Sequence, residues 1–207
     1  MAPYIIVSVL AYFIGSISFS VIFSRKFAGF DVREKGSKNA GSTNVLRTVG
    51  KKAAILTLIC DVLKGVLAVL IAIIASKIWS DINVQLLKYI AGFLAILGHT
   101  FPIFFEFRGG KGVATALGVL LTLNWKIGLV CLIFALLIMA FTKIVSIGSI
   151  LAAVLYPILT IFMGGTSFWC IVISILIALL VIFNHRSNLK RLREGTENKL
   201  SFKKWNM

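Results

Sequence analysis

Long apolar runs separated by short polar segments constrain this chain more than any other feature of its sequence. A bilayer core about 30 Å thick is crossed by about 20 apolar residues of α-helix. Seven runs approach this requirement, and the fourth and fifth are short. The expected spans are residues 4–23, 53–75, 86–105, 112–123, 126–141, 145–163 and 167–183. The sequence therefore predicts an all-α, polytopic integral membrane protein with seven transmembrane helices in a single membrane-embedded domain, residues 1–207.

The composition agrees with a lipid environment. Hydrophobic residues make up 59% of the chain and charged residues only 14%, whereas an ordinary soluble domain has about 25% charged residues. The first run has no basic residue before it and no convincing small-residue cleavage site, so we expect a retained helix and not a signal peptide. Cys60, Cys131 and Cys170 lie in separate apolar runs, which predicts small buried hydrophobic side chains.

Basic residues are distributed unevenly between the segments that join these spans. With the amino terminus outside, the inside segments are 24–52, 106–111, 142–143 and the tail from 184. They hold 18 of the 22 Lys and Arg residues, as the positive-inside rule predicts. Merging the fourth and fifth spans would put the basic tail on the opposite face from segment 24–52. We therefore expect seven spans, with the N-terminus outside and the C-terminus cytoplasmic.

The formal net charge of +15 suits orientation during insertion and attraction to an anionic lipid leaflet. The chain lacks the soluble module, repeated basic helix or aromatic platform of nucleic-acid readers, so we expect no nucleic-acid partner. The seven acidic residues are scattered, and neither histidine has a neighbouring set of carboxylate ligands. We therefore expect no metal and no cofactor.

Residues 31–47, DVREKGSKNAGSTNVLR, form the first of three polar clusters on the predicted cytoplasmic face. Glycines let a backbone turn and present N–H groups to an anion, and Arg47 can bind phosphate bidentately. The candidate binding residues are Gly36, Ser37, Asn39, Gly41, Thr43, Asn44 and Arg47. A polar loop with an amide-rich helix cap is the alternative interpretation.

Residues 98–115, GHTFPIFFEFRGGKGVAT, form the second cluster. An apolar run begins at Val113, so Lys111 lies beside a predicted helix N-terminus, which attracts anions. The spacing is not that of a P-loop, which removes the best support for nucleotide hydrolysis. The candidate residues are His99, Arg108, Gly109, Gly110 and Lys111. A hydrogen-bonded structural histidine and a positive-inside anchor are the alternatives for His99 and Arg108.

Residues 184–200, NHRSNLKRLREGTENKL, form the third cluster. We expect helical spacing to continue after the seventh span, because His185, Asn188 and Leu192 then fall on one face. A basic amphipathic helix at the membrane surface is the alternative.

Two further polar groups lie within predicted spans. Asp61 and Lys64 are three residues apart and can pair on one helical face, either for function or for structural support. Ser146 and Ser149 flank Gly148, which suits either close helix packing or a polar pocket.

Taken in order and spacing, these motifs resemble the bacterial membrane acyl-phosphate:glycerol-3-phosphate acyltransferases, the PlsY family. The resemblance covers nearly the whole chain and is carried by GSKNAGSTN with Arg47, GHTFPIFFEFRGGKGVAT and HRSNLKRLREGTE, with DVLKG and SIGS as smaller matches. The chain departs from the family pattern at Lys38, where glycine is expected, at Ser42, where alanine is usual, and at Ser18, where proline is usual.

The resemblance implies transfer of a fatty acyl group from acyl phosphate to glycerol 3-phosphate, giving lysophosphatidic acid and inorganic phosphate in phospholipid biosynthesis. The residues that it implies for catalysis are Ser37, Lys111, Ser149, His185 and Asn188. Those implied for substrate or phosphate binding are Gly36, Asn39, Gly41, Thr43, Asn44, Arg47, His99, Arg108, Gly109 and Gly110. The base is either His185 or a substrate phosphate. The H-x-x-x-x-D pair of other glycerolipid acyltransferases is absent, because Phe104 and Lys190 stand five residues after the two histidines.

The expected location is the bacterial plasma membrane, with the active site facing the cytoplasm and membrane lipid as a further partner. A phosphate or organophosphate transporter is the main alternative function, but it should place its site near the bilayer midplane between inverted repeats, which we do not find. A non-catalytic lipid-binding scaffold is the second alternative. The sequence leaves open the acyl-chain length, the oligomeric state, with a monomer as one option, and the path of the acyl donor.

Overall fold

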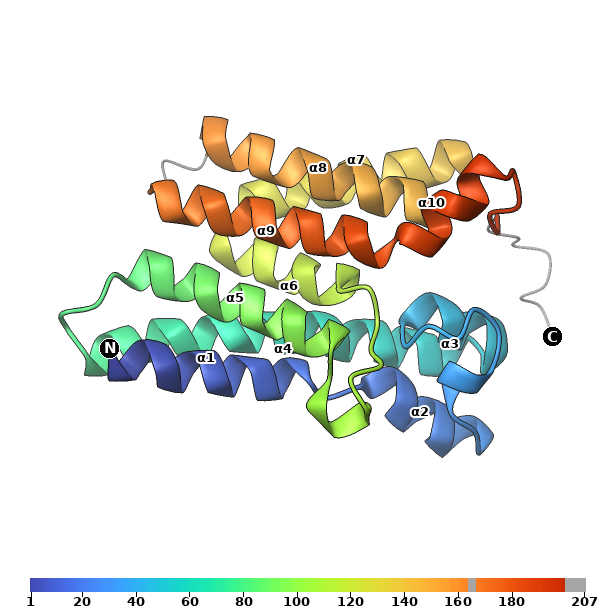
Figure 1. Ribbon diagram of the computed structural model, residues 1–207, viewed down its shortest axis with the longest axis horizontal. Helices are drawn as coiled ribbons and strands as arrows, with labels where there is room; N and C mark the ends of the chain where they lie inside the picture. Colours follow the sequence, from blue (N-terminus) through green and yellow to red (C-terminus); the bar gives the residue numbers. More distant parts are fainter. Residues whose placement is uncertain (164–166, 200–207) are drawn as a thin grey trace. The chain divides into compact units, whose positions relative to one another are not determined.

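The computed structural model describes residues 1–163 and 167–199, and every regular element in these two ranges is helical (Figure 1). The all-α prediction is therefore confirmed for the described chain. Its helices form two compact units, the first ending at Leu123 and the second beginning at Asn124. The expectation of a single domain stays a prediction. Within the described residues, five helical segments are long and apolar enough to cross a membrane, and a bent pair makes up to six, so the chain is a multi-pass membrane protein.

The first unit is built around one long helix. This helix, α4, contacts α1, α2, α3, α5 and α6. The helices of this unit are α1 (Ala2–Gly15), α2 (Phe19–Ala28), η1 (Val32–Glu34), α3 (Ser42–Thr48), α4 (Lys51–Ile78), α5 (Val84–Thr100), η2 (Ile103–Phe105) and α6 (Val113–Leu123).

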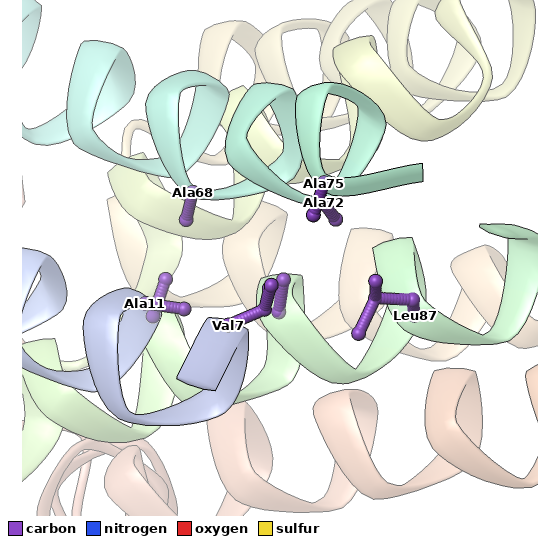
Figure 2. Close-up of a cluster of buried hydrophobic side chains, with 8 residues drawn as sticks. Val7, Ala11, Ala68, Ala72, Ala75 and Leu87 are labelled. Atoms are coloured by element: carbon purple, nitrogen blue, oxygen red, sulfur yellow. The ribbon is translucent and has the colours of Figure 1, made fainter. Parts of the chain in front are cut away.

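Small side chains let these helices approach closely. Figure 2 shows three alanines of α4 facing Val7 and Ala11 of α1 and Leu87 of α5 in a fully apolar cluster. At Gly98 a Cβ atom would collide with the carbonyl of Tyr12, and at Gly118 with the carbonyl of Val62. Membrane helices associate through such close packing, because lipid supplies no hydrophobic force between them.

The first predicted span, residues 4–23, lies within one apolar helical segment, Ala2–Ala28, that is long enough to cross a membrane, but the helix is locally interrupted there. Helix α1 ends at Gly15 and α2 begins at Phe19. The Nζ of Lys64 lies 2.7 Å from the carbonyl oxygen of Ile17, inside the break, and donates a hydrogen bond to it. The break therefore exposes a backbone acceptor that a buried ammonium group uses.

The fourth predicted span, 112–123, corresponds to α6, which has only 11 residues. At 1.5 Å per residue such a helix is about 17 Å long, well short of a bilayer core of about 30 Å. The seven-span prediction and the orientation of the termini are thus not confirmed by the helices alone.

The second unit contains α7 (Trp125–Thr142), α8 (Val145–Met163), α9 (Phe168–Asn184) and α10 (Arg186–Arg193). Asn124 caps α7 by accepting a hydrogen bond from the backbone N–H of Lys126, so the predicted separation of the fourth and fifth apolar runs is confirmed. A Cβ at Gly148 would lie 2.6 Å from the carbonyl oxygen of Ala135, so Gly148 serves close packing of α8 on α7.

Helical structure continues after the seventh span, as expected, but in a separate helix, α10. The axis bends by 55° between α9 and α10, and His185 occupies the junction. The last part of the third cluster, Leu200, and the basic residues Lys203 and Lys204 lie outside the described residues.

Candidate active site

The loop between η1 and α3 is held by one buried side chain, Asn44. Its Nδ2 donates to the carbonyl oxygens of Val32, Lys35 and Asn39 at 3.0, 3.0 and 3.1 Å. Its Oδ1 accepts a hydrogen bond from the backbone N–H of Ser37 at 3.0 Å. Asn44 is only 2% exposed, and its amide makes these hydrogen bonds within the loop. It therefore stabilises the conformation of the candidate binding segment.

Two residues of this loop adopt left-handed backbone conformations. Gly36 has φ +59°, and a Cβ there would collide with Oδ1 of Asn44. Lys38 has φ +58°, a region that non-glycine residues rarely adopt. The glycine that the family resemblance leads us to expect at position 38 would adopt this conformation readily, and this chain has a lysine there.

A buried ion pair that the sequence analysis did not select anchors the start of the loop. The Asp31 carboxylate accepts hydrogen bonds from Nε and NH2 of Arg33 at 3.0 and 2.9 Å, and from Arg25 at 2.9 Å. NH1 of Arg33 donates to the carbonyl oxygen of Phe105 at 2.7 Å. Burial opposes ionisation of Asp31, but the hydrogen bonds and charge of the arginines outweigh it and lower its pKa to about 2. This pair ties the first motif to the second.

At acidic pH, the free energy of unfolding should depend on whether Asp31 is protonated. Because its pKa falls from 3.8 to about 2 on folding, its contribution is complete above about pH 4 and is lost as the pH falls through about 2. We expect Asp31→Asn to reduce the free energy of unfolding at pH 7 by roughly 2 kcal/mol. The difference in Tm from wild type should shrink between pH 4 and pH 2 in detergent solution. A difference that stays constant over this range would contradict the assignment.

The glycine segment of the second motif folds back on the end of α5. The backbone N–H groups of Gly109 and Gly110 donate to the carbonyl oxygens of Thr100 and His99, each at 3.1 Å. A Cβ at Gly110 would collide with Nε2 of His99 and lie 2.5 Å from the carbonyl oxygen of Ala40. The second motif therefore packs directly against the first, and this contact needs glycine.

The structure places the remaining candidates of the first unit at different depths. Ser37 and Arg47 are exposed, whereas Asn39 and Lys111 are half-buried. Arg108 is exposed and lies 3.8 Å from Glu106, a surface ion pair. Thr43 and Gly41 lie at the start of α3, both half-buried. The buried contacts of Gly110 and Arg33 pack the two motifs against each other within the first unit.

The expected pairing of Asp61 with Lys64 is confirmed, and His99 joins it. Nζ of Lys64 lies 2.9 Å from Oδ1 of Asp61. Nδ1 of His99 lies 3.6 Å from the same oxygen. All three side chains are buried within the first unit. His99 is buried against Gly110, and its predicted role in substrate binding stays a prediction.

In the second unit, Glu197 forms hydrogen bonds with three side chains, from the third motif and from α8. Its carboxylate accepts hydrogen bonds from Ser146 Oγ at 2.9 Å, Asn188 Nδ2 at 2.6 Å and Arg191 Nε at 2.7 Å. Burial opposes its ionisation, but these donors outweigh burial and lower the pKa of Glu197. Glu197 was not among the predicted site residues, although an acidic residue within so basic a motif indicates an ion pair with one of its arginines.

His185 and Ser149 are also buried in the second unit. Nδ1 of His185 lies 2.7 Å from the carbonyl oxygen of Val181. A carbonyl can only accept, so Nδ1 carries the proton and the lone pair of the neutral ring is on Nε2. Ser149 donates its hydroxyl to the carbonyl oxygen of Val145 at 3.0 Å. The second unit thus holds an oriented imidazole, with the chemistry of a general base.

Comparison with known proteins shows which family the chain resembles. The family model described as "Glycerol-3-phosphate acyltransferase" matches residues 5–195. A glycerol-3-phosphate acyltransferase of Clostridioides difficile (strain 630) is 46% identical, covering 97% of each chain. One of Fusobacterium nucleatum is also 46% identical, covering 94% of this chain and 96% of the relative.

The fold is similar to solved structures as well. The crystal structure of PlsY (YgiH), an integral membrane glycerol 3-phosphate acyltransferase, in its glycerol 3-phosphate form aligns with a TM-score of 0.86, 35% identity and 97% coverage of both chains. The lysophosphatidic acid form of PlsY aligns with a TM-score of 0.83 and 34% identity, covering 96% of this chain and 95% of the other.

Proposed function

The chain belongs to the glycerol-3-phosphate acyltransferase family, and we propose that it transfers a fatty acyl group from acyl phosphate to glycerol 3-phosphate. The products are lysophosphatidic acid and inorganic phosphate. The observation that carries the proposal is the contact of Gly110 with the backbone at Ala40, which joins two basic, glycine-rich motifs in the first unit. Both proposed substrates are phosphate anions, and these motifs supply the cations and backbone turns that phosphate needs. Relatives crystallised in glycerol 3-phosphate and lysophosphatidic acid forms support the acceptor and the product.

The proposed reaction needs little covalent chemistry from the protein. Acyl phosphate is an activated mixed anhydride, so alignment of the substrates and stabilisation of developing charge are the main tasks. The acceptor hydroxyl oxygen bonds to the acyl carbon, and the bond from that carbon to the phosphate oxygen breaks. Lys111 and Arg47 supply positive charge to phosphate oxygens, and Ser37 adds a hydroxyl donor.

The side chains of the second unit take the remaining roles. Ser149 and Asn188 are hydrogen-bonding groups for substrate, and the hydroxyl proton passes to His185 or to a substrate phosphate. The hydrogen bond from His185 Nδ1 to Val181 supports a base role, because it directs the basic lone pair to Nε2.

The donor is tested with purified protein in detergent, labelled glycerol 3-phosphate, and either palmitoyl phosphate or palmitoyl-coenzyme A. Labelled lysophosphatidic acid should form with palmitoyl phosphate alone, with one inorganic phosphate released for each product. Equal product from the coenzyme A ester would contradict the proposed donor while leaving the acyltransferase assignment intact.

The proposal includes seven membrane spans, an outside N-terminus, a cytoplasmic C-terminus and an active site facing the cytoplasm of a bacterial plasma membrane. Asp81 and Lys38 are exposed on loops that this topology places on opposite sides. In a chain whose three native cysteines are replaced by alanine, Asp81→Cys should react with a membrane-impermeant maleimide in intact cells. Lys38→Cys should react only after the membrane is permeabilised. Labelling of Lys38→Cys in intact cells would contradict this orientation.

A further inference from the structure

Three ionisable side chains meet in the apolar interior of the first unit without a role in the proposed reaction. Asp61 and Lys64 lie on α4 and His99 lies near the end of α5, with side-chain exposures of 2%, 3% and 6%. Lys64 is held on two sides, by Oδ1 of Asp61 at 2.9 Å and by the carbonyl oxygen of Ile17 at 2.7 Å. Burying charged groups is costly, and helix packing alone does not require them at these positions.

The charges of this cluster determine the state of the imidazole. The Asp61 carboxylate and the Lys64 ammonium neutralise each other, and a protonated His99 would leave one uncompensated positive charge in the interior. His99 is therefore neutral. Its Nδ1 faces the Asp61 oxygen at 3.6 Å, longer than a hydrogen bond, and the negative charge of the carboxylate favours the neutral tautomer that carries its proton on Nδ1.

The opposite edge of the ring supports the glycine segment. Nε2 and Cε1 of His99 lie where a Cβ of Gly110 would be, with Cε1 3.0 Å from that position. The backbone N–H of Gly110 donates to the carbonyl oxygen of His99 at 3.1 Å. The ring thus packs against the backbone immediately before Lys111.

We infer that Asp61, Lys64 and His99 form a positioning network for Lys111. In this network Lys64 fixes the Asp61 carboxylate, Asp61 fixes the orientation and tautomer of His99, and His99 holds the Gly109–Gly112 segment that presents Lys111. The inference rests on the proposed phosphate-binding role of Lys111. It gives His99 a role other than the predicted one in substrate binding.

A double-mutant cycle between His99 and Lys111 separates positioning from general structural support. His99→Ala should lower kcat/KM about 10- to 100-fold in the wild-type background, the range seen for residues that orient a primary ligand. In a Lys111→Ala background the same change should cost less than about threefold, because the group that it positions is gone. Leu87→Ala, a buried apolar residue of the same helix, serves as the control and should change both backgrounds by one common factor. Equal losses for His99→Ala in both backgrounds would overturn the inference.

The tautomer provides a second test that needs no substrate. The chain has only two histidines, so ¹⁵N-histidine labelling gives two ring signals, and His185→Gln assigns them. Two-bond ¹H–¹⁵N correlations at neutral pH should show His99 as a neutral ring protonated on Nδ1. A charged ring, or a proton on Nε2, would overturn the network. Absence of acyl transfer would contradict the proposed function. The spectrum would still test the network, because it needs no substrate.

Discussion

Replacing Lys111 with alanine should lower kcat/KM for acyl transfer by about 10²- to 10³-fold, the loss expected for one charge-stabilising donor in an active site. Lys111 lies between Gly110, which is packed on His99 and Ala40, and Gly112, whose φ of +85° directs the chain into α6. Its backbone is therefore fixed on both sides, two residues before α6 begins at Val113. Initial rates with palmitoyl phosphate and glycerol 3-phosphate measure the effect.

Two matched variants make this loss interpretable. Lys111→Arg keeps the positive charge and should recover part of the activity. Lys77→Ala removes an exposed lysine from the last turn of α4, at the opposite end of that helix from the first motif, and should leave the rate unchanged. A Lys111→Ala protein with wild-type kcat/KM and wild-type Tm would remove Lys111 from the mechanism.

Asn44→Ala should lower both stability and activity. The change leaves the N–H of Ser37 and three loop carbonyls without the partner that now satisfies them. Loss of a buried hydrogen-bonding hub of this size costs roughly 2–4 kcal/mol. Because displacing catalytic groups by about 1 Å can cost a factor of about 100 in rate, we expect a loss of that order even at temperatures where the variant is folded. Thermal unfolding and kcat/KM are measured on the same preparation.

A nearby residue of the same helix provides the control. Ser42→Ala changes the half-buried first residue of α3, and it should change neither Tm nor rate. Asn44→Asp keeps an acceptor for Ser37 but sets a buried carboxylate against the three carbonyl oxygens, so its stability at neutral pH should be no higher than that of Asn44→Ala. Full activity in Asn44→Ala would show that the loop does not depend on this amide.

Hydropathy located most helices of the fold because lipid requires long apolar segments. The predicted spans 53–75, 86–105, 126–141 and 145–163 all lie within observed helical spans. The interruption at residues 16–18 was hidden because apolar residues flank it on both sides. The carbonyl of Ile17 that it exposes accepts a hydrogen bond from Lys64, a contact between residues far apart in sequence. The bend at His185 was missed for a related reason, because helical spacing of polar residues continues through it.

Contacts in the candidate site were predictable where both residues lie close together in one motif. They were less predictable where the partners are far apart in the sequence. The pairing of Asp61 with Lys64 follows from their spacing on one helix. The approach of His99 to Asp61 depends on how α5 packs beside α4, which the sequence pattern does not encode. Asp31 and Glu197 were not predicted because cations, hydroxyls and amides bind phosphate, whereas carboxylates do not. In the structure the two carboxylates accept hydrogen bonds from Arg33 and Asn188.

Sealed proteoliposomes containing the purified protein test the central claim most directly, because they distinguish acyl transfer from transport. Labelled glycerol 3-phosphate is added outside, with or without palmitoyl phosphate. The account predicts that the label moves into organic-extractable lysophosphatidic acid only when the donor is present, and that no label accumulates in the lumen without it. Label accumulating in the lumen without donor, and no lysophosphatidic acid with it, would contradict the account and identify an organophosphate transporter.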